Sequence, residues 1–193
     1  MKLIIGLGNL GSKYAVTRHN AGRSLVEYIA RQFHLKFSKK SRLGASMASW
    51  EWEGCPVTLA YPETFMNVSG EAVGGLVRFF KCDPERDLLV VVDDTALPFG
   101  GMRLRPRGSD GGHNGLKSVT QHLGSSNYAR LRLGIGMGLA VMSLESYVLS
   151  PFSTEECEIF PCFLARGLEA CQLWIGRSTE DAMNAVNSYP PIS

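Results

Sequence analysis

The sequence contains no long hydrophobic segment. Its most strongly apolar run, Leu88–Val92, covers five residues, whereas a helix that spans a bilayer needs about 20. The N-terminus reaches Gly6 directly after Met1–Ile5 and has neither the apolar core nor the cleavage site of a signal peptide. These absences exclude a membrane-spanning protein and predict a cytoplasmic one.

The motifs of metal-binding and disulfide-rich proteins are also missing. The five cysteines (55, 82, 157, 162 and 171) form no C-x-x-C pair, and the four histidines (19, 34, 113 and 122) form no H-E-x-x-H pattern. An odd set of cysteines without such spacing predicts buried free thiols. We therefore expect neither structural disulfides nor a bound metal.

No repeat, linker or low-complexity segment divides the 193 residues. Hydrophobic residues make up 45% and charged residues 20% of the chain, which is typical of a globular protein. A chain of this length buries about 70% of the surface that it exposes when extended. We expect residues 1–193 to form one domain and, because no long apolar edge or heptad pattern is present, a monomer.

The net charge of +2 conceals an uneven distribution. Residues 1–50 carry nine Lys or Arg and one acid, and residues 101–150 carry six and two; the other two blocks are acidic. If the two basic blocks share a face, they form a surface for a polyanion. The alternative is that these charges are scattered and solvated.

Short β-like runs alternate with helical patterns along the chain. The expected strands are Lys2–Gly6, Gly44–Trp50, Val57–Tyr61, Leu88–Asp93, Gly101–Arg105, Leu131–Gly136 and Tyr147–Leu149. The expected helices are Ala21–Phe33, Ser69–Phe80, Asn114–Gly124, a long helix from the capping box at Ser153–Glu156 to Gly176, and Thr179–Asn187. This order predicts a single-domain α/β fold, in which helices cover both faces of a twisted, mixed but mostly parallel central sheet of about seven strands.

The first strand leads into a glycine motif, Gly6-Leu7-Gly8-Asn9-Leu10-Gly11, which matches the G-x-G-x-x-G pattern of dinucleotide-binding loops. Three features count against that function. The next helix is expected to start only after Asn20, Arg31 stands where an acid would bind the ribose, and Asn9 brings a side chain to a loop in which backbone should contact the pyrophosphate. We expect no nucleotide cofactor.

Polar residues gather at the ends of the expected strands, where α/β proteins place their sites. They are Asn9, His19, Asn20, Asn67, Asp93, Asp94 and the segment Gly111–Gly115, which contains His113 and Asn114. Singly, each has a structural explanation, because the asparagines at 20, 67 and 114 can cap helices and Asp93 can simply end its strand. Together they suit hydrolysis in which a histidine deprotonates water, an aspartate orients the imidazole, and asparagine amides bind a carbonyl and its oxyanion.

Several motifs resemble, in order, the signatures of bacterial-type peptidyl-tRNA hydrolases. They are Gly6–Asn9 with Tyr14 and Thr17–Gly22, then Pro62–Gly70, Gly111–Ser118, Arg130–Gly136 and Ala182–Asn184. The resemblance covers essentially the whole chain. It implies hydrolysis of the ester that joins a peptide to the 3′ end of tRNA, with peptidyl-tRNA as the partner and with no metal, organic cofactor, DNA or membrane.

The resemblance also implies a role for each site residue. His19 would be the general base and Asp93 its partner, while Asn9 would bind near the terminal nucleotide or the reacting carbonyl. Asn67 and Asn114 would hold the water, the peptide backbone and the oxyanion. The remaining substrate contacts would be Tyr14 near the 3′ adenosine and Phe65, Met66, Gly112 and His113 along the peptide groove. Arg105 and Arg132 would clamp the 5′ phosphate of the tRNA, a task that suits the planar guanidinium.

A protein of a different class remains as the alternative. A plant organelle splicing factor shares this fold, and an Asp-Asp-Thr segment such as Asp93-Asp94-Thr95 is not unique to active enzymes. The chain would then be an RNA-binding relative without catalytic activity. Turnover of peptidyl-tRNA, compared with that of a His19→Ala variant, discriminates between the two.

Overall fold

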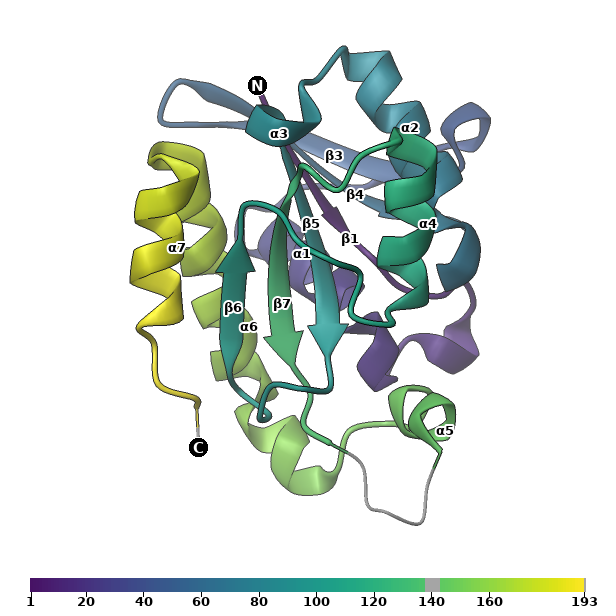
Figure 1. The fold of residues 1–193 in the computed structure, drawn as a ribbon, viewed down its shortest axis with the longest axis vertical. Coiled ribbons are helices and arrows are strands. Elements are labelled where there is room, and N and C mark those ends of the chain that lie inside the picture. The colour runs from purple at the N-terminus through teal and green to yellow at the C-terminus, as the bar shows by residue number, and fades with distance from the viewer. Residues whose placement is uncertain (138–142, 193) are drawn as a thin grey trace.

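The computed structural model describes residues 1–137 and 143–192. Most of these residues form a seven-stranded sheet and the helices that cover its two faces (Figure 1). The strands are β1 (Lys2–Gly6), β2 (Ser38–Lys40), β3 (Ala45–Trp52), β4 (Cys55–Pro62), β5 (Leu88–Asp94), β6 (Met102–Arg105) and β7 (Ala129–Gly134). Their order across the sheet is β2-β3-β4-β1-β5-β7-β6. The central strands β4, β1, β5 and β7 are parallel neighbours, whereas β6 and β3 run antiparallel to their neighbours. The predicted mixed, mostly parallel sheet is confirmed.

Alternation of side chains along the central strands creates two cores. Ile4 of β1 packs on the face covered by α1 (Ala21–Gln32), α6 (Thr154–Gly176) and α7 (Thr179–Asn187). Leu3 and Ile5 pack on the other face, against α2 (Ser69–Phe80) and α4 (Asn114–Leu123). Successive residues of a strand point to opposite faces, so a strand that is apolar throughout, such as β1 or β5, is covered on both sides.

Backbone contacts at glycines bring α1 against the sheet. A Cβ atom on Gly6 would lie 2.2 Å from the carbonyl oxygen of Gly22, and one on Gly22 would lie 2.2 Å from that of Val91. The glycine motif after β1 therefore serves the close approach of α1, which begins at Ala21, well beyond the motif. This packing fits the expectation that the motif is not a dinucleotide-binding loop.

The direction of the parallel strands determines where the polar segments meet. β1, β4 and β5 all end at the same edge of the sheet, so the segments that follow them lie close together there. The segments after β1 and β4 carry Asn9 and the short 3₁₀ helix η4 (Met66–Val68), and β5 itself ends in Asp93-Asp94. The 3₁₀ helices η1 (Ser12–Tyr14) and η2 (Arg18–Asn20) follow β1 and lead into α1 at this edge.

One strand prediction is wrong and one strand was missed. Tyr147–Leu149, expected as a strand, lies in and directly after the short helix α5 (Leu144–Val148), whose N-cap Ser143 accepts a hydrogen bond from the backbone of Ser146. A short apolar run fits a turn of helix as well as a strand, and periodicity does not separate them. The missed strand, β2, has three exposed polar residues and pairs with β3 at the edge of the sheet, so it carries no apolar signal. The remaining short elements are η3 (Ser41–Leu43) and α3 (Pro84–Asp87).

Candidate active site

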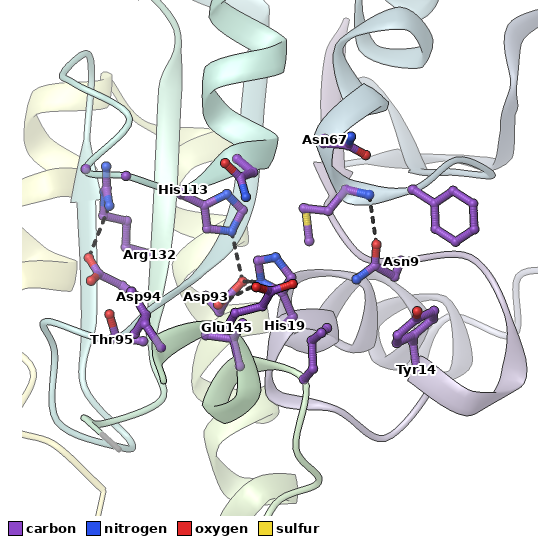
Figure 2. A pocket seen from close by; sticks show the side chains of 18 residues that line it. Asn9, Tyr14, His19, Asn67, Asp93, Asp94, Thr95, His113, Arg132 and Glu145 are labelled. Carbon is purple, nitrogen blue, oxygen red and sulfur yellow. Dashed lines mark hydrogen bonds and ion pairs between the residues drawn. The ribbon is translucent and has the colours of Figure 1, made fainter. Parts of the chain in front are cut away.

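A cavity of about 630 Å³ opens at the carboxyl edge of the sheet (Figure 2). Figure 2 shows Asn9 and Tyr14 on one side of it, Asp94 and Arg132 on the other, and His19, Asp93 and His113 between them. Twelve residues received a role from the resemblance, and eleven of them line this cavity: Asn9, Tyr14, His19, Phe65, Met66, Asn67, Asp93, Gly112, His113, Asn114 and Arg132. The twelfth, Arg105, is not among the described residues that line it.

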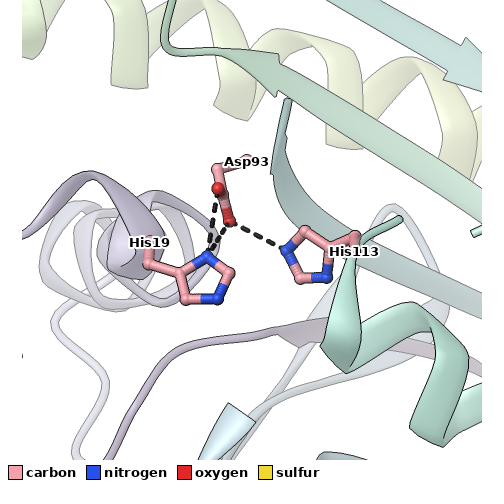
Figure 3. Close-up of side chains that lie close together, drawn as sticks. All are labelled: His19, Asp93 and His113. Atoms are coloured by element: carbon pink, nitrogen blue, oxygen red, sulfur yellow. Dashed lines mark hydrogen bonds and ion pairs between the residues drawn. The ribbon is translucent and has the colours of Figure 1, made fainter. Parts of the chain in front are cut away.

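Asp93 stands at the centre of the cavity floor and contacts two imidazoles (Figure 3). Nδ1 of His19 lies 2.9 Å from Oδ1 and 3.1 Å from Oδ2 of Asp93, and Nε2 of His113 lies 2.9 Å from Oδ1. The Asp93 side chain is only 3% exposed. Burial raises the pKa of this carboxyl, but the charge that His113 and His19 carry when they are protonated, together with their hydrogen bonds, outweighs burial and holds the pKa well below its usual range.

The ionised state of Asp93 determines which imidazole nitrogens carry hydrogen. A carboxylate only accepts hydrogen bonds, so both nitrogens that face it must be donors. For His19 the donor is Nδ1–H, and in the neutral ring the lone pair is then on Nε2. His19 Nε2 forms no hydrogen bond with any residue that the structure describes, and it is the atom that can accept a proton from water.

His19, Asp93 and His113 also have the composition of a metal-binding triad. Their ligand atoms lie within 4.8 Å of one another, and two imidazoles with one carboxylate suit several transition metals. His113 does not fit this role, because its Nδ1 accepts backbone hydrogen bonds from Gly115 and Leu116 at the start of α4. Its Nε2 must then carry the hydrogen, and coordination through Nε2 would break the contacts at the start of α4.

Asn9 is held in one orientation by hydrogen bonds on both sides. Its Oδ1 accepts from the backbone N–H of Met66 at 2.8 Å, which leaves the Nδ2 amide to point into the cavity (Figure 2). The backbone of Asn9 is paired with the side chain of Asn20, whose Oδ1 accepts from Asn9 N–H at 2.8 Å and whose Nδ2 donates to Asn9 C=O at 3.1 Å. The site therefore presents a neutral hydrogen-bond donor with a defined direction.

The three asparagines that could have been helix caps do not act as caps. Asn20 precedes α1 but makes no capping hydrogen bond, because its side chain is committed to Asn9. Asn67 lies within η4, one residue before Val68 at the N-cap of α2, and His113 rather than Asn114 caps α4. Asn67 and Asn114 are both exposed in the cavity wall and are free to bind a ligand.

Arg18 anchors the segment that carries His19. It is 7% exposed, forms an ion pair with Glu156 of α6, and donates to Ser150 Oγ at 2.7 Å. Its backbone N–H donates to Ser150 C=O at 3.1 Å. These bonds connect η2 to the start of α6, more than 130 residues further along the chain.

Sequence reasoning missed the wall formed by α5. Leu144, Glu145 and Val148 line the cavity from this helix, together with Leu149 directly after it. The sequence signal was Ser143 followed by Glu145 and Ser146, an N-cap pattern that the apolar run Tyr147–Leu149 obscured. Asp94 and Thr95 were also not assigned a role, although both line the cavity.

The two arginines expected to clamp a phosphate have different surroundings. Arg132 lines the cavity. Its Nη1 lies 3.3 Å from Asp94 Oδ2, and its Nη2 donates to Ser109 C=O at 2.8 Å. Arg105 is exposed on β6 and forms no ion pair among the described residues.

Pairing of β6 with β7 nevertheless places these arginines on the same face of the sheet. Arg103 is opposite Arg132 and Arg105 is opposite Arg130, and directly opposed residues of paired strands share a face. Arg130 is fully buried and binds the carbonyls of Gly108 and Ser109. Four arginines of the block 101–150 therefore lie on one face of the sheet, and one of them, Arg130, is in the interior.

Comparison with known proteins identifies the family of this chain. A family model described as peptidyl-tRNA hydrolase matches residues 3–192. Peptidyl-tRNA hydrolases of Roseiflexus castenholzii and Gloeobacter violaceus are 46% and 40% identical over 99% and 97% of this chain, which corresponds to 89% and 94% of those proteins. The crystal structure of peptidyl-tRNA hydrolase from Acinetobacter baumannii superposes with a TM-score of 0.92 at 33% identity, covering 100% of this chain and 97% of that one. The chain belongs to the peptidyl-tRNA hydrolase family.

Proposed function

We propose that this protein hydrolyses the ester bond between peptide and tRNA in peptidyl-tRNA, and so releases tRNA for reuse. The observation that carries the proposal is the pair His19–Asp93 in the cavity, with asparagine amides nearby and with His19 Nε2 bonded to none of the described residues. A non-catalytic RNA-binding protein would have no need of a histidine oriented by a buried carboxylate. The comparisons with peptidyl-tRNA hydrolases do not favour that alternative either.

The reaction begins when His19 Nε2 takes a proton from water. The resulting hydroxide oxygen forms a bond to the ester carbonyl carbon, and the carbonyl oxygen becomes an oxyanion. Asp93 stabilises the imidazolium through the hydrogen bond from Nδ1–H, as its ionised state allows. The tetrahedral intermediate then breaks its bond to the tRNA oxygen, which receives the proton from His19, so that the products are a peptide acid and a tRNA hydroxyl group.

The asparagines are assigned to the groups that change charge or must be oriented. Asn9 directs its Nδ2 donor into the cavity and would bind the reacting carbonyl or the terminal nucleotide. Asn67 and Asn114 would hold the water, the peptide backbone and the oxyanion, since neutral amides can stabilise developing negative charge without adding net charge. Tyr14, Phe65, Met66 and Gly112 would contact the 3′ adenosine and the peptide.

Arg105 and Arg132 would bind the 5′ phosphate of the tRNA. They share one face of the β6–β7 pair with Arg103, and phosphate contacts position a nucleic acid without reading its bases. Selection would then depend on the shape of tRNA and on the peptide attached to it.

No helix among residues 1–137 and 143–192 is both long and apolar enough to cross a membrane. We propose a cytoplasmic monomer.

The decisive experiment measures single-turnover hydrolysis of peptidyl-tRNA by the wild-type protein and by His19→Ala. The His19→Ala rate should fall by about 10²–10⁴-fold, the usual contribution of a general base, while the far-ultraviolet circular dichroism stays unchanged. A fall of less than about tenfold would contradict the assignment of His19 as the base. An inactive wild-type protein that still binds tRNA would favour the RNA-binding alternative.

A further inference from the structure

We infer that His113 is a positioning residue that acts on the reaction through Asp93, rather than a contact for the peptide. This inference rests on the proposed function. The sequence predicted His113 as part of the peptide groove, but the structure shows both of its ring nitrogens bonded within the protein. Its side chain is 8% exposed, which leaves little of it for a substrate to touch.

Each nitrogen of His113 has a separate partner and a separate task. Nδ1 accepts from the backbone N–H groups of Gly115 and Leu116, at 3.1 and 3.3 Å, and thereby caps α4. A nitrogen that accepts carries no hydrogen, so Nε2 carries the hydrogen of the neutral ring. Nε2–H then donates to Asp93 Oδ1 at 2.9 Å (Figure 3). The backbone hydrogen bonds at the start of α4 therefore determine which tautomer of His113 is hydrogen-bonded to Asp93.

This arrangement restrains Asp93 with a hydrogen bond in addition to those that face His19. Oδ1 receives the hydrogen bond from His113, and both carboxylate oxygens face His19 Nδ1. The centroids of the two imidazole rings lie 4.9 Å apart, and the ring planes are inclined at 49° to each other. At this distance each ring limits the rotation of the other. Without His113, the carboxylate could turn about its χ2 angle, and the direction of His19 Nε2 would be less well defined.

The same geometry connects α4 to the catalytic pair. His113 directly precedes Asn114, the first residue of α4, which lines the cavity. A helix start that is capped by His113 and bonded to Asp93 holds Asn114 at a constant distance from His19. The imidazole of His113 therefore aligns both His19, which accepts the proton, and Asn114, whose amide is assigned to the oxyanion.

Two substitutions separate the two tasks of His113. In His113→Asn the side-chain oxygen can replace Nδ1 as the cap, since Asn is among the best N-cap residues, but no donor reaches Asp93. In His113→Gln the terminal amide can take the place of Nε2 and donate to Asp93, but the cap is lost. We expect His113→Asn to unfold near the wild-type temperature and to lose about 10- to 100-fold in kcat with little change in KM. We expect His113→Gln to be less stable and to retain more of kcat than His113→Asn.

The pH dependence of kcat/KM supplies a readout that a purely structural role would not move. The other charged side chains that line the cavity are Asp94 of β5, Glu145 of α5 and Arg132 of β7, besides the catalytic pair His19 and Asp93, and all of them are retained in both variants. When the hydrogen bond from His113 Nε2–H is lost, the negative charge of the Asp93 carboxylate stabilises protonated His19 more strongly. The acid limb of the profile should therefore move to higher pH in His113→Asn and stay closer to the wild type in His113→Gln.

Other results would overturn the inference. If His113→Asn raises KM without lowering kcat, His113 is a substrate contact. If both variants lose kcat equally and in proportion to their stability, its role is structural only. A measurement on the unaltered protein tests the same point: long-range proton–nitrogen NMR spectra should show His113 protonated at Nε2, and protonation at Nδ1 would refute the inference. An inactive wild-type protein with the Nε2–H tautomer would instead count against the proposed function.

Discussion

At the scale of single residues, the site depends on hydrogen bonds that leave each functional atom with one possible role. Asp93 can only accept, so His19 must present Nε2 to the cavity, and Met66 N–H occupies Asn9 Oδ1, so Asn9 must present Nδ2. Reactive atoms that are oriented before substrate binds need no reorganisation during the reaction.

Replacement of Asn9 by Asp tests this orientation. An Asp side chain can still accept from Met66 N–H, as Asn9 Oδ1 does at 2.8 Å, but it offers a carboxylate oxygen to the cavity in place of the Nδ2 donor. We expect kcat for peptidyl-tRNA to fall by about 10²–10³-fold, as for loss of an oxyanion donor, while the melting temperature changes little. A matching loss of stability would show that Asn9 matters mainly for the fold.

Asp93 should also make stability depend on pH. Its folded-state pKa lies below the value of about 3.9 in unfolded chains, so the unfolded state binds a proton first as the pH falls. The stabilisation by Asp93 is therefore complete above about pH 4 and declines below it. Urea unfolding of the wild type and of Asp93→Asn should show a difference in free energy of unfolding that shrinks below about pH 4. A difference that is constant with pH would contradict the low pKa.

At the scale of elements, the start of α4 must lie very close to η4. A Cβ atom on Gly115 would meet Met66 Sδ at 2.6 Å, Leu7 Cδ1 at 2.8 Å and His113 Cε1 at 3.0 Å. A larger residue at position 115 would force at least one of these side chains to shift. The two sides of the cavity therefore meet at Gly115, whose backbone lies against the side chains of Met66, Leu7 and His113.

Gly115→Ala should therefore displace His113 or Met66 and reduce activity. Overpacking of this kind typically costs about 1–3 kcal/mol in the free energy of unfolding, and a displaced His113 would lower kcat as well. Gly75→Ala in α2 is the matched control, because its nearest neighbour, Leu43 Cδ2, would be 3.8 Å away. This control should keep its activity and gain up to about 1 kcal/mol from the better helix propensity of Ala. Equal activity in the two variants would contradict the close fit at Gly115.

At the scale of the whole molecule, the arginine face of β6 and β7 extends the site beyond the cavity. If both Arg105 and Arg132 clamp the 5′ phosphate, as the resemblance implies, loss of either should raise KM for full-length substrate. The structure separates the two, because Arg105 is exposed and without an ion pair among the described residues, whereas Arg132 binds Asp94 and Ser109 beside the catalytic pair.

Arg105→Ala should raise KM for peptidyl-tRNA and leave kcat almost unchanged, since a phosphate contact is the same in the ground and transition states. It should also reduce the slope of log binding constant against log salt by about 0.7–0.9. Arg132→Ala should raise KM and lower kcat. On a peptide esterified to a short 3′ fragment, which has no 5′ phosphate at this place, Arg105→Ala should act like the wild type and Arg132→Ala should remain impaired. Equal losses for Arg105→Ala on both substrates would contradict the clamp.

The sequence by itself determined the α/β class, six of the seven strands, the main helices and the chemical inventory of the site, because apolar periodicity and local motifs depend on near neighbours. Only the tertiary structure decided that Tyr147 and Val148 belong to a helix beside the cavity, that Asn20 supports Asn9 instead of capping α1, and that His113 bonds to Asp93. The physical reason is distance along the chain. His19 and Asp93 are 74 residues apart and Asn9 and Met66 are 57 apart, so their hydrogen bonds, and with them the tautomers and amide orientations, exist only once the sheet has brought the ends of its strands together.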